Sequence, residues 1–233
     1  WTMEYSFLMF ILVRNAVQYA LLALLYQLAD SGATGGLVDL LILRDETGAY
    51  NGYSGDVSSI IAALGFIGGA LAVWSTAKLL ISKNKDDMHL SHLKKDGKAR
   101  YALLITATIG AVIGFNLLFE LLGVTNKSEA YTEVVSQQYS AHFLVGLLVF
   151  GFISPIAEEL LFRGIIYGYL RRFLDLKLAI ALSALIFGVY HMNYVQGVYG
   201  FLIGCLMAYA YEYFGDFKMS VFVHVASNVI AYC

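Results

Sequence analysis

Proline and charged residues are scarce in this chain of 233 residues. It contains one proline, and Asp, Glu, Lys and Arg together make up 14% of the residues. Soluble domains carry about a quarter of charged residues, so a loop-rich soluble enzyme is excluded. The formal net charge is only −2 and no basic stripe is present, so no nucleic-acid partner is expected.

Cysteine is also rare, since Cys205 and Cys233 are the only two. They form no CxxC pair, which argues against a thiolate metal site and against a disulfide framework. Cys205 falls in an apolar segment, where a small packing residue is expected. No Ser–His or Cys–His pairing is evident, so nothing supports a covalent acyl-enzyme.

Long apolar runs dominate the chain, in which 59% of the residues are hydrophobic. A helix needs about 20 apolar residues to cross a bilayer. The runs predict an all-α fold, a polytopic transmembrane helix bundle with about seven spans (roughly six to eight) in one domain over residues 1–233. The expected spans are 6–29, 57–81, 101–122, 142–170, 178–193, 198–214 and 219–232, with the connectors YVQG and GDFK between the last three. The first run is too long for a signal peptide and is interpreted as a span.

Basic residues gather in alternate connectors. Segment 82–100 carries six Lys or Arg residues and segment 171–177 carries three, whereas 30–56 and 123–141 carry one each. The positive-inside rule therefore places 82–100 and 171–177 in the cytoplasm. The expected protein is a multi-pass protein of the cell membrane, with a cytoplasmic N-terminus and an outside C-terminus.

Two adjacent carboxylates and an arginine interrupt the run 142–170. Ionised groups at bilayer depth are costly and usually functional. Adjacent helical positions are about 100° apart, so Glu158 and Glu159 point in different directions. Arg163 follows Glu159 by four residues, the spacing at which helix side chains meet. The geometry pairs Glu159 with Arg163 and leaves Glu158 as a candidate general base for water. The alternative is a purely structural ion cluster of all three.

Two later apolar segments carry polar residues at helical spacing. His191 follows Phe187 by four residues, and Asn228 follows His224 by four, so each pair is expected on one helix face. Measured along each span at 1.5 Å per residue, Glu158 and His191 lie roughly 18 and 20 Å deep. His224 and Asn228 lie roughly 9 and 15 Å deep. The depths overlap within a turn or so. These residues are expected either to meet at one site or to be satisfied core polar groups.

The three patterns also resemble a known set of motifs. They read Glu158-Glu159-xxx-Arg163, Phe187-xxx-His191 and His224-xxx-Asn228. In this order they resemble the motifs of the CPBP intramembrane proteases, the CAAX-protease and bacteriocin-processing group also called the Abi family. The resemblance covers 142–232, which is identified as the set of catalytic helices.

The resemblance implies a glutamate mechanism. Glu158 would activate the attacking water, assisted by His191, while His224 and Asn228 would form the oxyanion site. Glutamate with two histidines is also a set that binds zinc, but no HExxH occurs and the resemblance implies a metal-free mechanism, so no cofactor is expected. The supporting residues are Glu159 and Arg163, which would hold the helix and tune the base, Phe187 as a packing or substrate contact, and Asn193 as a helix-end or secondary polar residue.

The function expected from these residues is that of an intramembrane endopeptidase. Its partners would be the lipid bilayer and a membrane-associated peptide or protein substrate. Family members act on prenylated C-termini, on secreted peptide precursors or on unidentified targets, and the sequence does not choose among these. Two alternatives remain open, a non-catalytic membrane scaffold or immunity partner and a small proton-coupled transporter with Glu158 as its protonatable group.

Overall fold

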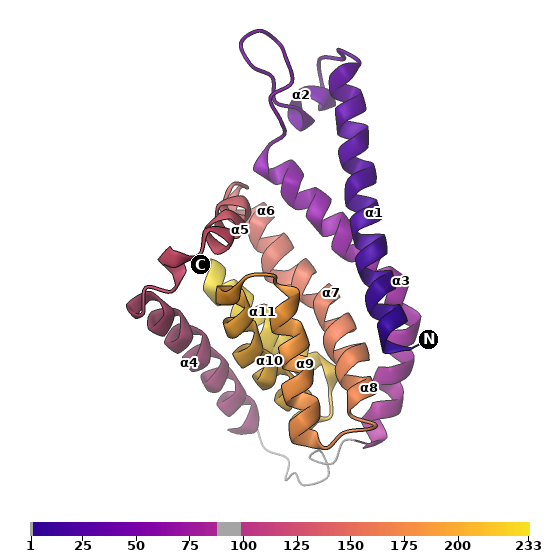
Figure 1. Ribbon diagram of the computed structural model, residues 1–233, viewed down its shortest axis with the longest axis vertical. Coiled ribbons are helices and arrows are strands. Elements are labelled where there is room, and N and C mark those ends of the chain that lie inside the picture. The colour runs from indigo at the N-terminus through magenta and orange to yellow at the C-terminus, as the bar shows by residue number, and fades with distance from the viewer. Residues whose placement is uncertain (1, 88–98) are drawn as a thin grey trace.

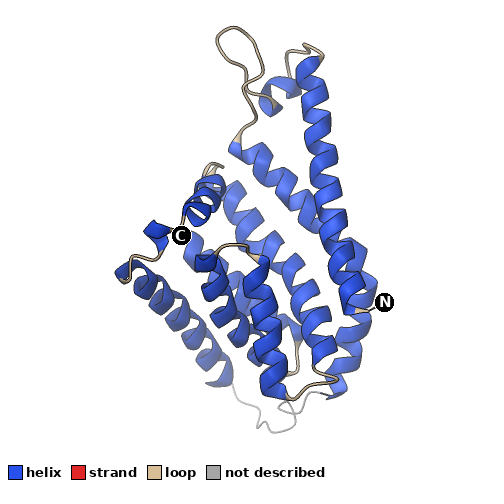
Figure 2. Cartoon of the chain, in the orientation of Figure 1, coloured by secondary structure: helices blue, strands red, loops and turns tan. Residues whose placement is uncertain are grey.

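The computed structural model describes residues 2–87 and 99–233. Within these ranges the regular structure is helical, apart from one isolated antiparallel bridge between Arg44 and Tyr50 (Figure 2). This confirms the predicted all-α class. The α-helices are α1 (Met3–Asp30), α2 (Leu37–Leu41), α3 (Gly55–Asp87), α4 (Ala99–Leu121), α5 (Glu129–Tyr139), α6 (Phe143–Gly146), α7 (Ser154–Leu161), α8 (Gly168–Leu170), α9 (Leu176–Tyr190), α10 (Tyr194–Phe214) and α11 (Phe217–Tyr232). A short 3-10 turn, η2 (Thr125–Lys127), and two π-helical segments, η3 (Leu147–Ile153) and η4 (Phe162–Tyr167), complete the set.

Every predicted span corresponds to a helical segment, and α6, η3, α7, η4 and α8 join into one continuous helix. Four segments are long and apolar enough to cross a bilayer, namely Met3–Asp30, Gly55–Asn84, Ala99–Leu121 and Phe143–Leu170. Leu176–Tyr190 is an apolar but shorter helix. The chain is therefore a multi-pass helical membrane protein.

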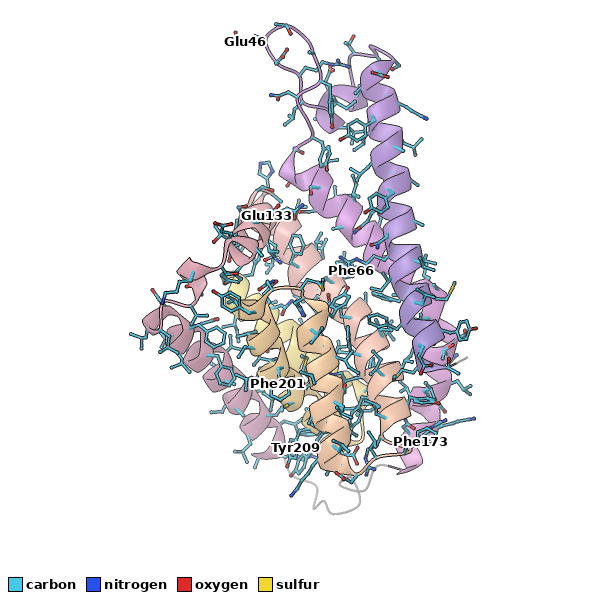
Figure 3. The ribbon with its side chains drawn as sticks, in the orientation of Figure 1. Glu46, Phe66, Glu133, Phe173, Phe201 and Tyr209 are labelled. Atoms are coloured by element: carbon cyan, nitrogen blue, oxygen red, sulfur yellow. The ribbon has the colours of Figure 1, made fainter. Side chains whose placement is uncertain are left out.

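The helices pack as two groups that meet along the continuous helix. α1 lies along α3, while α9, α10 and α11 pack against one another and against the continuous helix (Figure 1). The end of α3, the α8–α9 connector and the α10–α11 turn lie at one end of the molecule, and α2 lies at the other. The side-chain view agrees, because Phe173 and Tyr209 lie at the first end and Glu46 lies at the tip of the second (Figure 3).

The boundaries of three connectors and of one span need correction. Residues 82–87 continue α3 and residues 99–100 begin α4, so the remainder of the predicted basic connector, 88–98, lies outside the described residues. YVQG is the first turn of α10 rather than a connector, because Asn193 caps that helix by accepting a hydrogen bond from the Gln196 amide at 2.9 Å. The predicted span 178–193 ends earlier for the same reason, since α9 stops at Tyr190. GDFK is likewise cut short, with α11 already beginning at Phe217.

Glycines on two helices allow the close approach that builds the site. A Cβ on Gly164 would lie 3.3 Å from the Cβ of Ala77 on α3, and one on Gly168 would lie 2.4 Å from the amide nitrogen of Asn84. On α10, a Cβ on Gly204 would lie 3.1 Å from the Cβ of Ala184 on α9. Small residues at a spacing of four permit such helix contacts in membranes, which brings the helices that carry the motifs together.

Candidate active site

The four residues predicted to do chemistry come from three helical segments and line one cavity. Glu158 lies on α7, His191 directly follows α9, and His224 and Asn228 lie on α11. The cavity has a volume of about 500 Å³, which is in the range of small-ligand sites. The polar residues that the depth comparison placed in overlapping layers therefore face a common space.

Glu158 is held near the surface of this cavity by its own helix. Glu158 is 5% exposed. The hydroxyl of Ser154, one turn earlier, donates a hydrogen bond to Oε1 of Glu158 at 3.3 Å. The π-helical segment η3 ends immediately before Ser154, next to Pro155. Proline has no N–H to donate to the carbonyl four residues earlier, and π-helical turns occur often at functional sites. The only proline of the chain thus stands one turn before the candidate base.

Glu159 points away from the cavity and forms the ion pair expected from its spacing to Arg163. Nη1 of Arg163 donates to Oε1 of Glu159 at 2.6 Å, and neither side chain is exposed. Nη2 of Arg163 donates to the carbonyl of Gly204 on α10 at 3.0 Å, and the guanidinium carbon lies 4.7 Å from the ring centre of Phe187 on α9. The arginine therefore joins the continuous helix to both α9 and α10.

His224 connects the two glutamates, which the sequence did not indicate. Its Nδ1 lies 3.0 Å from Oε1 of Glu159, and its Nε2 lies 3.6 Å from Oε2 of Glu158. The carboxylate of Glu159 accepts a hydrogen bond from Nδ1–H, so Nε2 of a neutral His224 carries no hydrogen. His224 can donate a hydrogen bond from Nε2 only as an imidazolium.

His191 sits at the end of α9 rather than within it, which corrects the expected helical position. Its ring Nδ1 lies 2.9 Å from the carbonyl of Phe187, so Nδ1–H donates to that carbonyl and Nε2 is left as an acceptor. The next residue, Met192, has a φ of 57°, a left-handed conformation that is uncommon outside glycine. This residue reverses the chain between α9 and α10 and holds His191 at the cavity.

The ring of Phe187 orients both histidines. Its centre lies 4.8 Å from that of His191 and 5.3 Å from that of His224, and both contacts are edge-to-face. Phe187 is only 2% exposed although it lines the cavity. Its contacts therefore fit packing between the site residues, one of the two roles expected for it, and its ring also covers the Arg163 guanidinium.

The two asparagines have different positions. Nδ2 of Asn228 donates to the carbonyl of Phe150 in η3 at 2.9 Å, which ties α11 to the continuous helix and leaves one N–H of the amide for the cavity. Asn193 caps α10, and its Nδ2 donates to the carbonyl of His191 at 3.1 Å. Asn193 is thus a helix-end residue that fixes the chain beside His191.

Sequence reasoning missed several residues near the site. Ser154 precedes Glu158 by four residues, a spacing that would have indicated the contact. Arg14 on α1 lines the same cavity and donates a hydrogen bond from Nη1 to the hydroxyl of Tyr190, a contact that was not predicted. No sequence spacing links these two, because they lie on separate helices far apart in the chain.

A second buried polar cluster lies at the other end of the continuous helix. Glu212 on α10 is fully buried, accepts a hydrogen bond from the Tyr167 hydroxyl at 2.6 Å and pairs with Arg171 at 3.2 Å. In the sequence, Arg171 was counted only among the three basic residues of the connector 171–177. Its side chain is 16% exposed and instead fastens that connector to α10.

The metal alternative can be compared with the arrangement of side chains. Within residues 2–87 and 99–233, no group of three or more His, Cys, Asp and Glu side chains is placed to hold a metal ion. The candidate zinc set of one glutamate and two histidines is therefore not gathered into a ligand cluster. The expectation that no cofactor is needed stays a prediction.

Comparison with known proteins gives one match. The family model described as Type II CAAX prenyl endopeptidase Rce1-like matches residues 140–230. The matched region coincides with the segment that carries the three motifs, which confirms the family predicted from them. No curated protein and no solved structure matches the chain.

Proposed function

From the membership of residues 140–230 in the Rce1-like family of type II CAAX prenyl endopeptidases, we propose that this protein hydrolyses a peptide bond of a membrane-associated peptide or protein. Glu158 is the proposed base. The observation that carries the proposal is the position of Glu158, which faces the cavity together with His191, His224 and Asn228 while its neighbour Glu159 is neutralised by Arg163.

The proposed reaction begins with water bound between Glu158 and His191. Glu158 accepts a proton from the water while Nε2 of His191 accepts a hydrogen bond from it, since the other ring nitrogen is engaged with Phe187. The water oxygen forms a bond to the carbonyl carbon, and the carbonyl oxygen takes the negative charge. A positioned base of this kind contributes typically about 10² to 10⁴ in rate.

The negative oxygen is stabilised by donors on α11. In this proposal the free N–H of Asn228 and Nε2–H of protonated His224 both point to it. When the intermediate collapses, the C–N bond breaks and Glu158 gives its proton to the leaving amine, which returns the carboxylate. No covalent bond to the enzyme forms at any step. Donors placed at a developing oxyanion are each worth about 10² to 10³ in rate.

Substrate and orientation are proposed with the reaction. A prenylated peptide C-terminus is the substrate class that the matched family's description gives, and a membrane-associated peptide without a prenyl group is the broader class.

The end of the molecule that carries the α8–α9 connector is proposed to be cytoplasmic, in a cell membrane, because that connector holds Arg171, Arg172 and Lys177.

The proposal is tested by incubating the purified protein in liposomes with internally quenched peptides, prenylated and unprenylated, and identifying products by mass spectrometry. Cleavage at one bond, with no hydroxamate product when hydroxylamine is added, is the expected result. A hydroxamate would reveal an acyl-enzyme and contradict direct attack by water. Proton-coupled flux of a solute without any cleavage would favour the transporter, and neither activity would favour the scaffold.

A further inference from the structure

Arg14 on α1 contributes a cation to the cavity from outside the family-matched region. Its Nη1 donates to the hydroxyl of Tyr190, the residue that precedes His191. Its guanidinium carbon lies 4.2 Å from the ring centre of Phe66 on α3, a residue labelled in Figure 3. Arg14, Phe66 and Tyr190 all line the cavity that Glu158 faces. The contacts hold the guanidinium in one place at the wall between α1, α3 and α9.

Among the described residues, no carboxylate is in direct contact with Arg14. Of the described residues that line the cavity, Arg14 is the single Lys or Arg and Glu158 the single Asp or Glu. None of the ion pairs formed among the described residues includes Arg14. Its partners are a phenol and two aromatic rings, which carry no net charge. Cations inside a membrane normally pair with an opposite charge. The one carboxylate of the cavity, Glu158, forms no ion pair with Arg14 among the described residues, so the guanidinium has no directly bonded anion.

One nitrogen of the guanidinium also lacks a hydrogen-bond acceptor. The Nε atom of Arg14 is buried and has no hydrogen-bond partner, although buried donors are usually satisfied. The five N–H donors of an arginine guanidinium form a rigid fork, which can donate two parallel hydrogen bonds to one carboxylate. Gln18 lies one turn further along α1 and lines the same cavity, where it adds an uncharged donor.

We propose that Arg14 forms a binding subsite for a carboxylate of the peptide substrate, either the C-terminal carboxylate or an acidic side chain near the scissile bond. The subsite rests on the proposed peptidase function. Arg14 comes from α1 and contacts Tyr190 beside His191; in this proposal it anchors the substrate and takes no part in the bond changes. Arg14 is therefore a specificity-determining residue, contributed by a helix that the family model does not cover.

The test measures binding separately from cleavage. Three fluorescent lipid-anchored peptides are compared. The first has a free C-terminal carboxylate and no acidic side chain, and the second has a C-terminal carboxamide and no acidic side chain. The third has a C-terminal carboxamide and one glutamate. Their affinity is measured by fluorescence anisotropy in liposomes with the Glu158→Gln protein, so that no turnover interferes. Arg14→Gln and Arg14→Lys are added to this background. Arg44→Gln is the matched control, because Arg44 lies in the loop after α2 and bonds only backbone carbonyls.

At least one carboxylate peptide is expected to bind about tenfold or more tightly than the plain carboxamide, the scale of a hydrogen bond to a charged group. Arg14→Gln should abolish this difference, Arg14→Lys should keep part of it, and Arg44→Gln should leave it unchanged. Whichever carboxylate peptide shows the preference identifies the source of the anion. Equal binding of all three peptides, no binding of any, or a preference that survives Arg14→Gln would overturn the subsite. A preference that depends on Arg14 in a protein that cleaves nothing would retain the subsite and reject the peptidase.

Discussion

Oε1 of Glu159 lies 3.0 Å from Nδ1 of His224, and the same oxygen accepts the 2.6 Å hydrogen bond from Arg163. The first and third motifs are thus joined through one carboxylate oxygen. Glu159 fixes the ring of His224 with Nδ1 toward itself and Nε2 toward Glu158. Arg163 supplies the charge that makes an ionised Glu159 tolerable in a fully buried position. The two adjacent glutamates consequently have separate tasks, one as the proposed base and the other as the positioner of the histidine.

Removing the charge of Arg163 should destabilise the protein as well as inactivate it. Arg163→Gln leaves the buried Glu159 without its cation, and breaking one side of such a pair costs about 3–5 kcal/mol. Thermal unfolding in detergent should show a clearly lowered Tm, whereas Arg44→Gln should not change it. The double variant Arg163→Gln with Glu159→Gln should recover part of the loss. A fully stable and active Arg163→Gln protein would contradict the proposed role of the pair.

Asn228→Ala should mainly reduce kcat. The variant removes the proposed oxyanion donor, which corresponds to a loss of about 10² to 10³ in kcat with little change in KM. It also removes the hydrogen bond to the Phe150 carbonyl, so the Tm has to be measured in parallel. Ser227→Ala is a suitable neighbour control, because the Ser227 hydroxyl donates only to the Val223 carbonyl on its own helix. An effect confined to KM would argue against the oxyanion role.

Gly204→Ala should disturb the site by crowding Arg163. The added Cβ would lie 3.1 Å from Nη2 of Arg163 and 3.2 Å from the backbone Cα of Ala184, and backbone of this kind yields little. Overpacking typically costs about 1–3 kcal/mol, which unfolding in detergent would detect. Gly114→Ala on α4 is the matched control, since a Cβ there meets nothing within 4 Å. Equal stability of the two variants would refute the close-packing account.

Chelators should leave the activity unchanged. The described side chains do not gather three or more ligands for a metal ion, and the proposed mechanism needs only the carboxylate of Glu158 and the groups around it. Initial cleavage rates are compared before and after dialysis against 1,10-phenanthroline. Activity that disappears on dialysis and returns with zinc would replace the glutamate mechanism by a metal-dependent one.

The sequence predicted those features of the site that depend on spacing along one helix. The Glu159–Arg163 pair follows from a separation of four residues, and the capping contact between Asn193 and Gln196 could have been predicted from their separation of three. The helical bundle followed from the apolar runs, and each of the seven runs corresponds to a helical segment, four of which are long and apolar enough to cross a bilayer. These features are local, so the backbone geometry of a single helix determines them.

Features that depend on how helices rotate against one another could not be predicted. The contact of His224 with both glutamates and the reach of Arg14 to Tyr190 join residues from different helices. The depth of each residue along its helix axis predicted which layer of the membrane it lies in, but not the direction in which its side chain points. The π-helical segments on both sides of α7 also shift the rotation of the continuous helix relative to a regular α-helix, and no periodicity in the sequence marks them.

The central claim is that the carboxylate of Glu158 activates water, and the rate of peptide cleavage by Glu158→Gln tests it most directly. Glutamine has nearly the same shape but accepts no proton, so kcat should fall by at least about 10² at an unchanged Tm. Glu46→Gln, at the exposed loop tip far from the cavity (Figure 3), should cleave like the wild type. Equal cleavage by wild type and Glu158→Gln would contradict the account.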